Sequence, residues 1–290
     1  MSRISACVKA GPAAVLCAIL FSVGCSVSPG EFRSPISIPD RFSATGSQDC
    51  ETRWWKDFRD WGLSAVVHEA LTSNFSLQTV WDRLAQAEAI ARQEGADLLP
   101  SVSLAAGASR TRTQTGDIAT YASRLHLEAA AGYEIDLWGR IRSKREAALL
   151  DVQAGELDVQ AAAVSLSASV ASTWYRLAEA LAQVRILASQ RKTNEQLLEL
   201  VTLRFQQGQI QAVDVLRQRQ LVQSSKGVLA LAEQRVESLR HQLAVLLGKP
   251  PKADLGIPDP SLVMPGALPE TGVPAEWMQR RPDVRSAYLA

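Results

Sequence analysis

The 290-residue sequence predicts a mainly α-helical chain that one β-hairpin interrupts. Apolar residues recur at three- and four-residue steps through most of the chain, which is the period of an amphipathic helix. No proline occurs between positions 140 and 249, so a very long helical pattern is possible there. Between 98 and 138 the period changes to two, which is the period of a strand.

Composition excludes several classes of function. The formal net charge is +1, which gives no reason to expect a nucleic-acid partner. The four cysteines and three histidines do not stand at metal-ligand spacings. We therefore expect no metal, no cofactor, no catalytic residue and no enzyme activity.

Residues 1–24 have the pattern of a bacterial signal peptide. Arg3 and Lys9 give a positive start, and an apolar stretch from 11 to 23 follows that is too short to be read as a spanning helix. The small residue before Cys25 resembles a lipoprotein signal, in which that cysteine is acylated. We predict lipidation at Cys25, with plain signal cleavage as the alternative. Ser26 follows in place of Asp, so nothing retains the protein at the inner membrane.

Residues 25–61 are expected to form an irregular, anchored N-terminal segment. Its first part is rich in Ser, Pro and Gly, and its last part contains Trp54, Trp55, Phe58 and Trp61. These aromatic residues favour a segment that packs onto the helices behind it, although a ligand platform can also be drawn from them.

We expect a first structural repeat over 62–248, made of helices and the hairpin. A helix over 62–95 comes first, because Leu63, Val67 and Leu71 begin an apolar stripe. Pro100 keeps this helix from continuing into the hairpin.

The hairpin over 98–138 alternates between an apolar and a polar face. The apolar residues of its second arm are Leu125, Leu127, Ala129, Ala131, Tyr133, Ile135 and Leu137. Each arm has the roughly 9–11 residues that a tilted transmembrane strand needs, and a long polar loop is expected between the arms. An apolar-out, polar-in hairpin is the unit of a membrane β-barrel.

The polar face of the second arm carries ionisable residues that would point into a barrel lumen: His126, Glu128, Glu134 and Asp136. They could tune the field in the lumen, or they could be only hydrated wall residues. Glu134 and Asp136 could also be drawn as an acid–base pair, but no pocket signal supports one.

Two further helices are expected, over 139–205 and 212–247. The first would be about 100 Å long, while the second and the helix over 62–95 would be about 50 Å each. One long helix can therefore run beside two short helices laid end to end, in a long antiparallel coiled coil. Attached to a membrane hairpin, such a stalk is suited to cross a wide aqueous gap.

The run Tyr133–Arg140, YEIDLWGR, resembles the signature of outer-membrane efflux proteins, which are TolC-like channels. The lipoprotein branch of tripartite drug pumps is the most similar. The resemblance implies an α-barrel segment under a twelve-stranded outer-membrane β-barrel, closed by a homotrimer that is lipid-anchored and extends into the periplasm. It implies passive export of drugs or toxic compounds, with an inner-membrane pump and a periplasmic adaptor as partners.

The same resemblance places the far tip of the stalk at the turn between the two long helices. Gly208, Gln209, Ile210 and Asp214 lie there. In the family such tips meet the adaptor, although a turn that merely needs glycine explains these residues equally well.

Residues 249–290 are expected to be a linker and the start of a second repeat. Asn74–Trp81 and Arg281–Tyr288 align weakly as an internal echo. One hairpin is half of what the family barrel needs, so we expect a chain truncated after its first repeat; assembly of six copies and a partner that supplies the other half are alternatives. A different function also stays open: a periplasmic coiled-coil adaptor or structural protein without channel activity.

Overall fold

The computed structural model describes residues 39–46, 53–264 and 266–290. The predicted signal peptide and the predicted lipidation site Cys25 lie outside the described residues. From Asp40 to Ala290 the chain forms one unit. Among the described residues, no helix combines the length and the apolar character needed to cross a bilayer.

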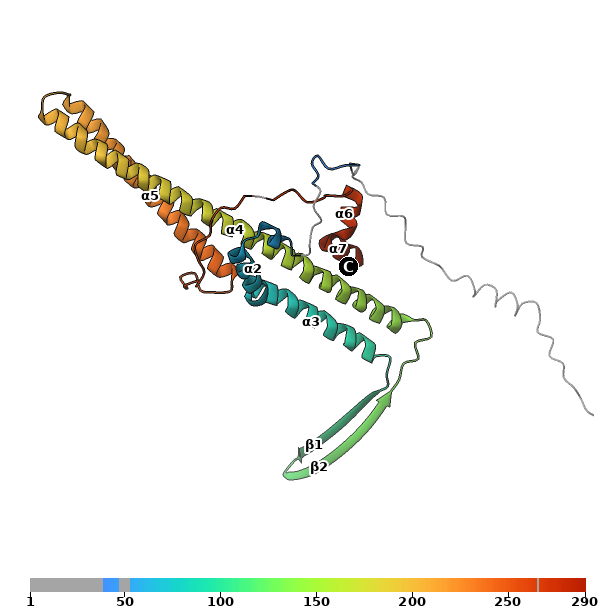
Figure 1. Ribbon diagram of the computed structural model, residues 1–290. Helices are drawn as coiled ribbons and strands as arrows, with labels where there is room; N and C mark the ends of the chain where they lie inside the picture. Colours follow the sequence, from blue (N-terminus) through green and yellow to red (C-terminus); the bar gives the residue numbers. More distant parts are fainter. Residues whose placement is uncertain (1–38, 47–52, 265) are drawn as a thin grey trace, which may run out of the picture. The chain divides into compact units, whose positions relative to one another are not determined.

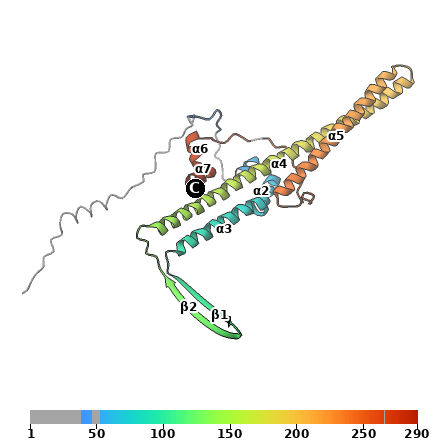
Figure 2. The same cartoon turned by 180° about the vertical axis from the view of Figure 1, so that it is seen from behind.

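The axis of this unit is the 67-residue helix α4 (Arg140–Gln206). Helix α5 (Ala212–Leu246) returns along the C-terminal half of α4, and α3 (Phe75–Ala96) lies along its N-terminal half (Figures 1 and 2). The predicted helices over 139–205 and 212–247 agree with α4 and α5 to within one residue at each end. The expected pairing of one long helix with two short ones is also found.

The predicted single helix over 62–95 is wrong, because the chain breaks at Asn74 into α2 (Trp61–Ser73) and α3. Asn74 has extended backbone geometry, and its side-chain oxygen accepts a hydrogen bond from the Leu77 amide at 3.0 Å. Its side-chain nitrogen donates to the Leu246 carbonyl at 2.9 Å. The buried Asn74 therefore caps α3 and joins the break to the C-terminal end of α5.

The hydrophobic core lies where α2, α4 and α5 meet, near the middle of α4. Trp174 is its largest side chain and is 1% exposed. Around it lie apolar residues from all three helices: Leu63, Val66, Val67, Ala70, Val170, Leu177, Val236, Leu239 and Leu243. Buried apolar surface of this kind is the main source of stability in a fold, so this region holds the helices together.

Asp60 connects the start of α2 to this core. One of its carboxylate oxygens accepts from the Leu63 amide at 3.0 Å and caps α2, and the other accepts from the Trp174 indole nitrogen at 2.9 Å. The Tyr175 hydroxyl also donates to it, at 3.4 Å. Burial, followed by the nearby negative charge of Asp60, raises the pKa of Tyr175 to about 12. Tyr175 is therefore neutral at physiological pH.

The aromatic residues before α2 pack onto the core, as the sequence favoured. Trp54 and Phe58 belong to the short helix η1 (Trp54–Phe58), and together with Trp55 they are partly buried against the core cluster. The ring centres of Phe58 and Tyr175 lie 5.6 Å apart. Trp61 differs from the others, because it is 80% exposed.

The C-terminal part of the chain ends in the short helices α6 (Pro274–Arg280) and α7 (Pro282–Leu289). Helix α7 packs on α4, where the Ser286 hydroxyl donates to the Asp158 carboxylate at 2.6 Å. The two weakly similar stretches of sequence, around 74–81 and 281–288, thus both open helices that lie against α4.

We expect Asp60→Ala to lower the free energy of unfolding by about 2 kcal/mol, because it removes a helix cap and leaves the Trp174 indole nitrogen without its acceptor. Urea unfolding followed by circular dichroism measures this. The control Asp57→Ala removes an exposed carboxylate of η1 and should change the value by less than about 0.5 kcal/mol. Equal effects of the two substitutions would contradict this role of Asp60.

Candidate functional site

Strands β1 (Ser101–Thr115) and β2 (Ile118–Gly132) form an antiparallel hairpin of fifteen residues in each arm. The expected long polar loop is wrong, because pairing continues to Thr115 and Ile118 and leaves a turn of two residues, Gly116 and Asp117. Gly116 has a φ of +62°, which suits glycine at the first position of such a turn. The Thr-rich stretch therefore belongs to the strands.

The register divides the hairpin into two faces, since directly opposed residues point to the same side. We define the apolar face by Val102, Leu104, Ala106 and Ala108 of β1 and by Leu125, Leu127, Ala129 and Ala131 of β2. Its large side chains are exposed, Leu125 to 84%. A continuous exposed apolar surface of this kind marks a membrane or protein contact.

The opposite face of the hairpin is polar. His126 and Glu128 lie on it, opposite Gly107 and Ala105, as the alternation predicted. A Cβ at position 107 would come within 2.2 Å of the His126 ring, so glycine makes room for that ring. The ring thus crosses onto the neighbouring strand.

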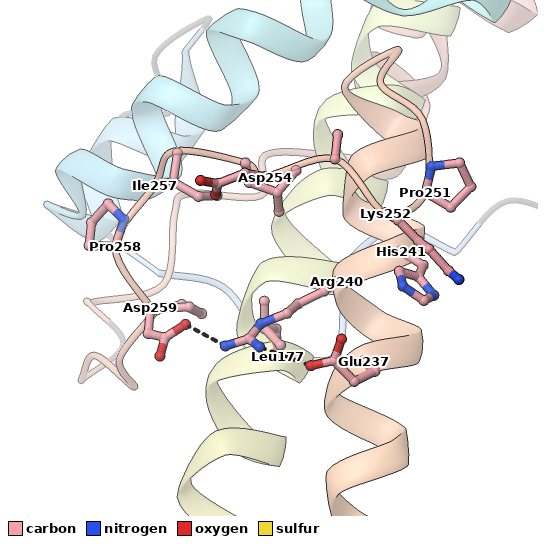
Figure 3. Close-up of a pocket in the computed structure, with 13 residues that line it drawn as sticks. Leu177, Glu237, Arg240, His241, Pro251, Lys252, Asp254, Ile257, Pro258 and Asp259 are labelled. Carbon is pink, nitrogen blue, oxygen red and sulfur yellow. Dashed lines mark hydrogen bonds and ion pairs between the residues drawn. The ribbon is translucent and has the colours of Figure 1, made fainter.

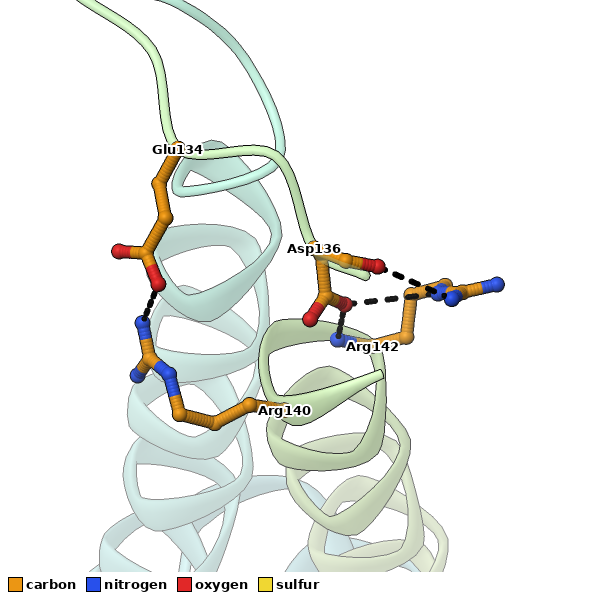
Figure 4. Close-up of polar contacts among 4 residues, drawn as sticks. All are labelled: Glu134, Asp136, Arg140 and Arg142. Atoms are coloured by element: carbon orange, nitrogen blue, oxygen red, sulfur yellow. Dashed lines mark hydrogen bonds and ion pairs between the residues drawn. The ribbon is translucent and has the colours of Figure 1, made fainter. Parts of the chain in front are cut away.

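Glu134 and Asp136 do not share this face, because β2 ends at Gly132. Both carboxylates instead pair with arginines in the first turn of α4 (Figure 4). Glu134 binds Arg140 at 2.7 Å, and Asp136 accepts from the Arg142 side chain at 3.4 Å. Each carboxylate thus has its own arginine partner, and the two are not arranged as the acid–base pair that could be drawn from them. Their expected lumen positions stay a prediction.

Asp136 caps the start of α4, which the N-cap residue itself cannot do. The N-cap residue, Gly139, has no side chain to accept a hydrogen bond, and the Asp136 carboxylate accepts one from the Arg142 amide at 3.0 Å. This backbone hydrogen bond is the main reason that the pKa of Asp136 is lowered. The hydrogen bond from Arg140 to Glu134 likewise raises the pKa of Arg140. We call residues Tyr133–Arg142 the junction, since this segment carries the hairpin into the stalk.

The turn at the far tip of the stalk is built mainly by its own hydrogen bonds. Gly208 has a φ of +74°, and the Gln209 amide donates to the Arg204 carbonyl at 3.0 Å. The side chains of Gln211 and Asp214 form a capping box at the start of α5. Asp214 therefore has a structural role. At Gly208 the positive φ favours glycine, while space does not require it, because an added Cβ would meet no atom within 4 Å.

A cleft of about 740 Å³ that the sequence did not reveal lies between the loop after α5 and the helices α4 and α5 (Figure 3). Arg240 crosses it and pairs with Glu237 at 2.9 Å and with Asp259 at 3.0 Å. The hydrogen bond that Arg240 donates to Asp259 is the main cause of the raised pKa of Arg240. Leu255 and Ile257 of the loop pack against the core. These contacts hold the loop on the helices.

Across 39–46, 53–264 and 266–290, no three His, Cys, Asp or Glu side chains come together in a way that could hold a metal ion. The residues that the geometry singles out are those of the hairpin faces and the junction. The sequence located both faces by their period of two. It did not reveal that the acidic residues of the junction serve α4, although the arginines six positions later are a usable signal.

A family model described as outer membrane efflux protein matches residues 66–249. The pyoverdine export outer membrane protein OpmQ of Pseudomonas putida is 33% identical over 82% of this chain and 52% of that protein. The toluene efflux pump outer membrane protein TtgF of the same species is 30% identical over 83% and 51%. The open-state MtrE outer membrane channel of Neisseria gonorrhoeae has 26% identity and a TM-score of 0.71, over 92% of this chain and 61% of that one.

The chain belongs to the outer membrane efflux protein family. The suspected resemblance and the predicted fold class are thereby confirmed, and membership of this non-enzymatic family agrees with the expectation that the chain is not an enzyme. Its relatives are outer membrane proteins, which supports the same location here. The chain spans about half the length of the curated relatives that it matches.

Gly139→Ala should destabilise the start of α4, because Gly139 has a φ of +76° and a left-handed backbone costs an L-residue about 1–2 kcal/mol. Thermal unfolding measures the loss. The control Gly132→Ala lies at the same end of the hairpin, and its added Cβ would meet only Ser101 Oγ, at 3.4 Å. It should stay within about 0.5 kcal/mol of the original chain. A loss of the same size in the control would contradict a specific need for glycine at the junction.

Proposed function

We propose that the chain contributes to the outer-membrane channel of a tripartite efflux pump, which passively exports drugs or toxic compounds. The observation that carries this proposal is the continuous apolar face of the hairpin in a member of an efflux family. A transmembrane strand needs roughly 9–11 residues, and each arm here has fifteen. The relatives named for export of pyoverdine and toluene support a role with small organic compounds.

The stalk supports the same proposal by its length. Helix α4 has 67 residues and spans about 100 Å at 1.5 Å per residue. With the hairpin in the outer membrane, its far tip would extend deep into the periplasm. We propose that this tip meets a periplasmic adaptor through Gly208, Gln209, Ile210 and Asp214. An inner-membrane pump would complete the assembly. The exposed apolar residues near the tip, such as Leu200 and Leu203, suit a contact with other helices.

We further propose that a homotrimer closes the barrel and that this hairpin supplies part of each subunit's strands. The lumen side would carry His126, Glu128, Glu134 and Asp136. The lumen is wide and hydrated in this proposal, so the pump would select the exported compound. An acyl group on Cys25 would add a second attachment to the membrane besides the hairpin.

Cysteine labelling in isolated outer membranes tests the membrane hairpin. In a Cys50→Ser background, a membrane-impermeant maleimide should label Glu128→Cys quickly and Leu127→Cys slowly, because neighbouring residues of a strand point to opposite faces. Detergent should make both sites reactive. Fractionation alone does not distinguish a channel component from a periplasmic coiled-coil protein, since an acyl anchor could carry either of them to the membrane. Equal labelling of both sites before detergent would contradict the proposed function.

Acylation at Cys25 has its own test. Cys25→Ala should abolish the incorporation of radiolabelled palmitate by the cells into this chain, while Cys50→Ala should leave it unchanged. Incorporation that persists in Cys25→Ala would contradict acylation at that residue.

A further inference from the structure

The apolar face of the hairpin changes character before the strands end. Beyond Ala108 and Leu125, the same face carries Arg110 and Arg112 on β1 and Tyr121 on β2. Arg112 is directly opposite Tyr121 in the register. The face that the proposed function turns toward lipid thus ends in two cations and an aromatic ring, on the half of the hairpin next to its turn.

The two arginines are held over one ring. The guanidinium carbon of Arg110 lies 5.1 Å from the centre of the Tyr121 ring, and that of Arg112 lies 5.8 Å from it. The Arg112 guanidinium also donates to the Gln114 side chain at 3.2 Å. These contacts orient both cations along the outer part of the face.

No carboxylate neutralises this pair within the part of the chain that the structure describes: neither arginine lies within ion-pair distance of one there. Two like charges two residues apart on one strand face repel each other, so an anion that bridges them is favoured. Arginine binds phosphate with two parallel hydrogen bonds, which makes phosphate a well-matched anion.

The position of the pair along the strand agrees with a membrane edge. Arg110 is nine residues beyond Ser101, the first residue of β1. At about 3.4 Å per residue and a strand tilt of about 40°, this places Arg110 about 23 Å along the barrel axis. The apolar band of an outer-membrane barrel is about 25 Å tall and is flanked by aromatic residues. Arg110 and Arg112 would therefore lie at the far edge of the band, beside the girdle residue Tyr121.

We propose that Arg110, Arg112 and Tyr121 form a binding site for the phosphate of anionic lipid headgroups at the outer surface of the membrane. The site rests on the proposed function, because it requires the apolar face to lie in lipid. The arginine stems would extend along the apolar surface and place the guanidinium groups at headgroup level. Tyr121 would hold the two cations at that depth.

Vesicle flotation of the full chain tests the site, with phosphatidylglycerol vesicles as the anionic probe and phosphatidylcholine vesicles as the neutral one. Each basic residue near an anionic surface strengthens binding about fivefold. Arg110→Gln with Arg112→Gln should therefore weaken partitioning into the anionic vesicles about 25-fold and leave partitioning into neutral vesicles unchanged. Added salt should weaken the binding of the original chain to the anionic vesicles.

The matched control is Arg124→Gln, which removes a charge near the same height from the opposite face. It should leave both partitionings unchanged. An equal loss in Arg124→Gln and the double variant, or an equal loss of the double variant in both lipids, would overturn the lipid site. A preference for neither lipid in the original chain would overturn the site and leave the proposed function intact. Failure of the original chain to bind either vesicle would overturn the membrane hairpin itself.

Discussion

The structure depends on how the hydrogen-bonding groups of two strands are satisfied. β1 and β2 pair with each other along fifteen residues and leave the outer edge of each strand for another partner. In a bilayer an unpaired backbone group costs several kcal/mol, so the free edges of the hairpin must pair there with strands from other copies of the chain or from a partner. In water, its exposed leucines and valine would be equally unfavourable. In the membrane location proposed for it, the hairpin therefore needs other strands that complete a closed sheet.

This requirement explains the arrangement of the helices. The strands that close the sheet must come together at one height, so each hairpin needs a support that fixes its position. Helix α4 gives that support, because α3 and α5 pack along its two halves and α2 joins them at Trp174. Asn74 and Asp60 fix the helix ends at this point with hydrogen bonds to α5 and α4. The core thus lies in the stalk, far along the chain from the strands that it positions.

The sequence predicted the features that follow from a single period. The alternation over 125–131 identified the apolar face, and the proline-free run from 140 gave the length of α4. It failed where two local rules compete. At Asn74 a polar side chain caps a new helix inside an apolar stripe, and a hydrogen bond to Leu246, 172 residues away, also stabilises the break. The composition of the Thr-rich stretch predicts a loop, but strand pairing continues from Ser101 and Gly132 up to the turn. The cleft at Arg240 depends on a folded loop that has no periodic pattern.

The junction shows the same competition within one motif. Tyr133–Leu137 continues the alternation of β2 in sequence, yet the strand ends at Gly132, where its partner β1 begins at Ser101. The carboxylates of Glu134 and Asp136 then bind the first turn of α4. Both side chains of the Glu134–Arg140 pair are more than half exposed, and such ion pairs contribute only about 0–1 kcal/mol to the free energy of unfolding in water. Stability is therefore a poor explanation for these contacts. Their geometry is a better one: Asp136 binds both the backbone and the side chain of Arg142, and Gly139 supplies the turn between them. Together these residues fix the direction in which the hairpin leaves the helix, which a chain must specify if its strands are to meet those of its neighbours.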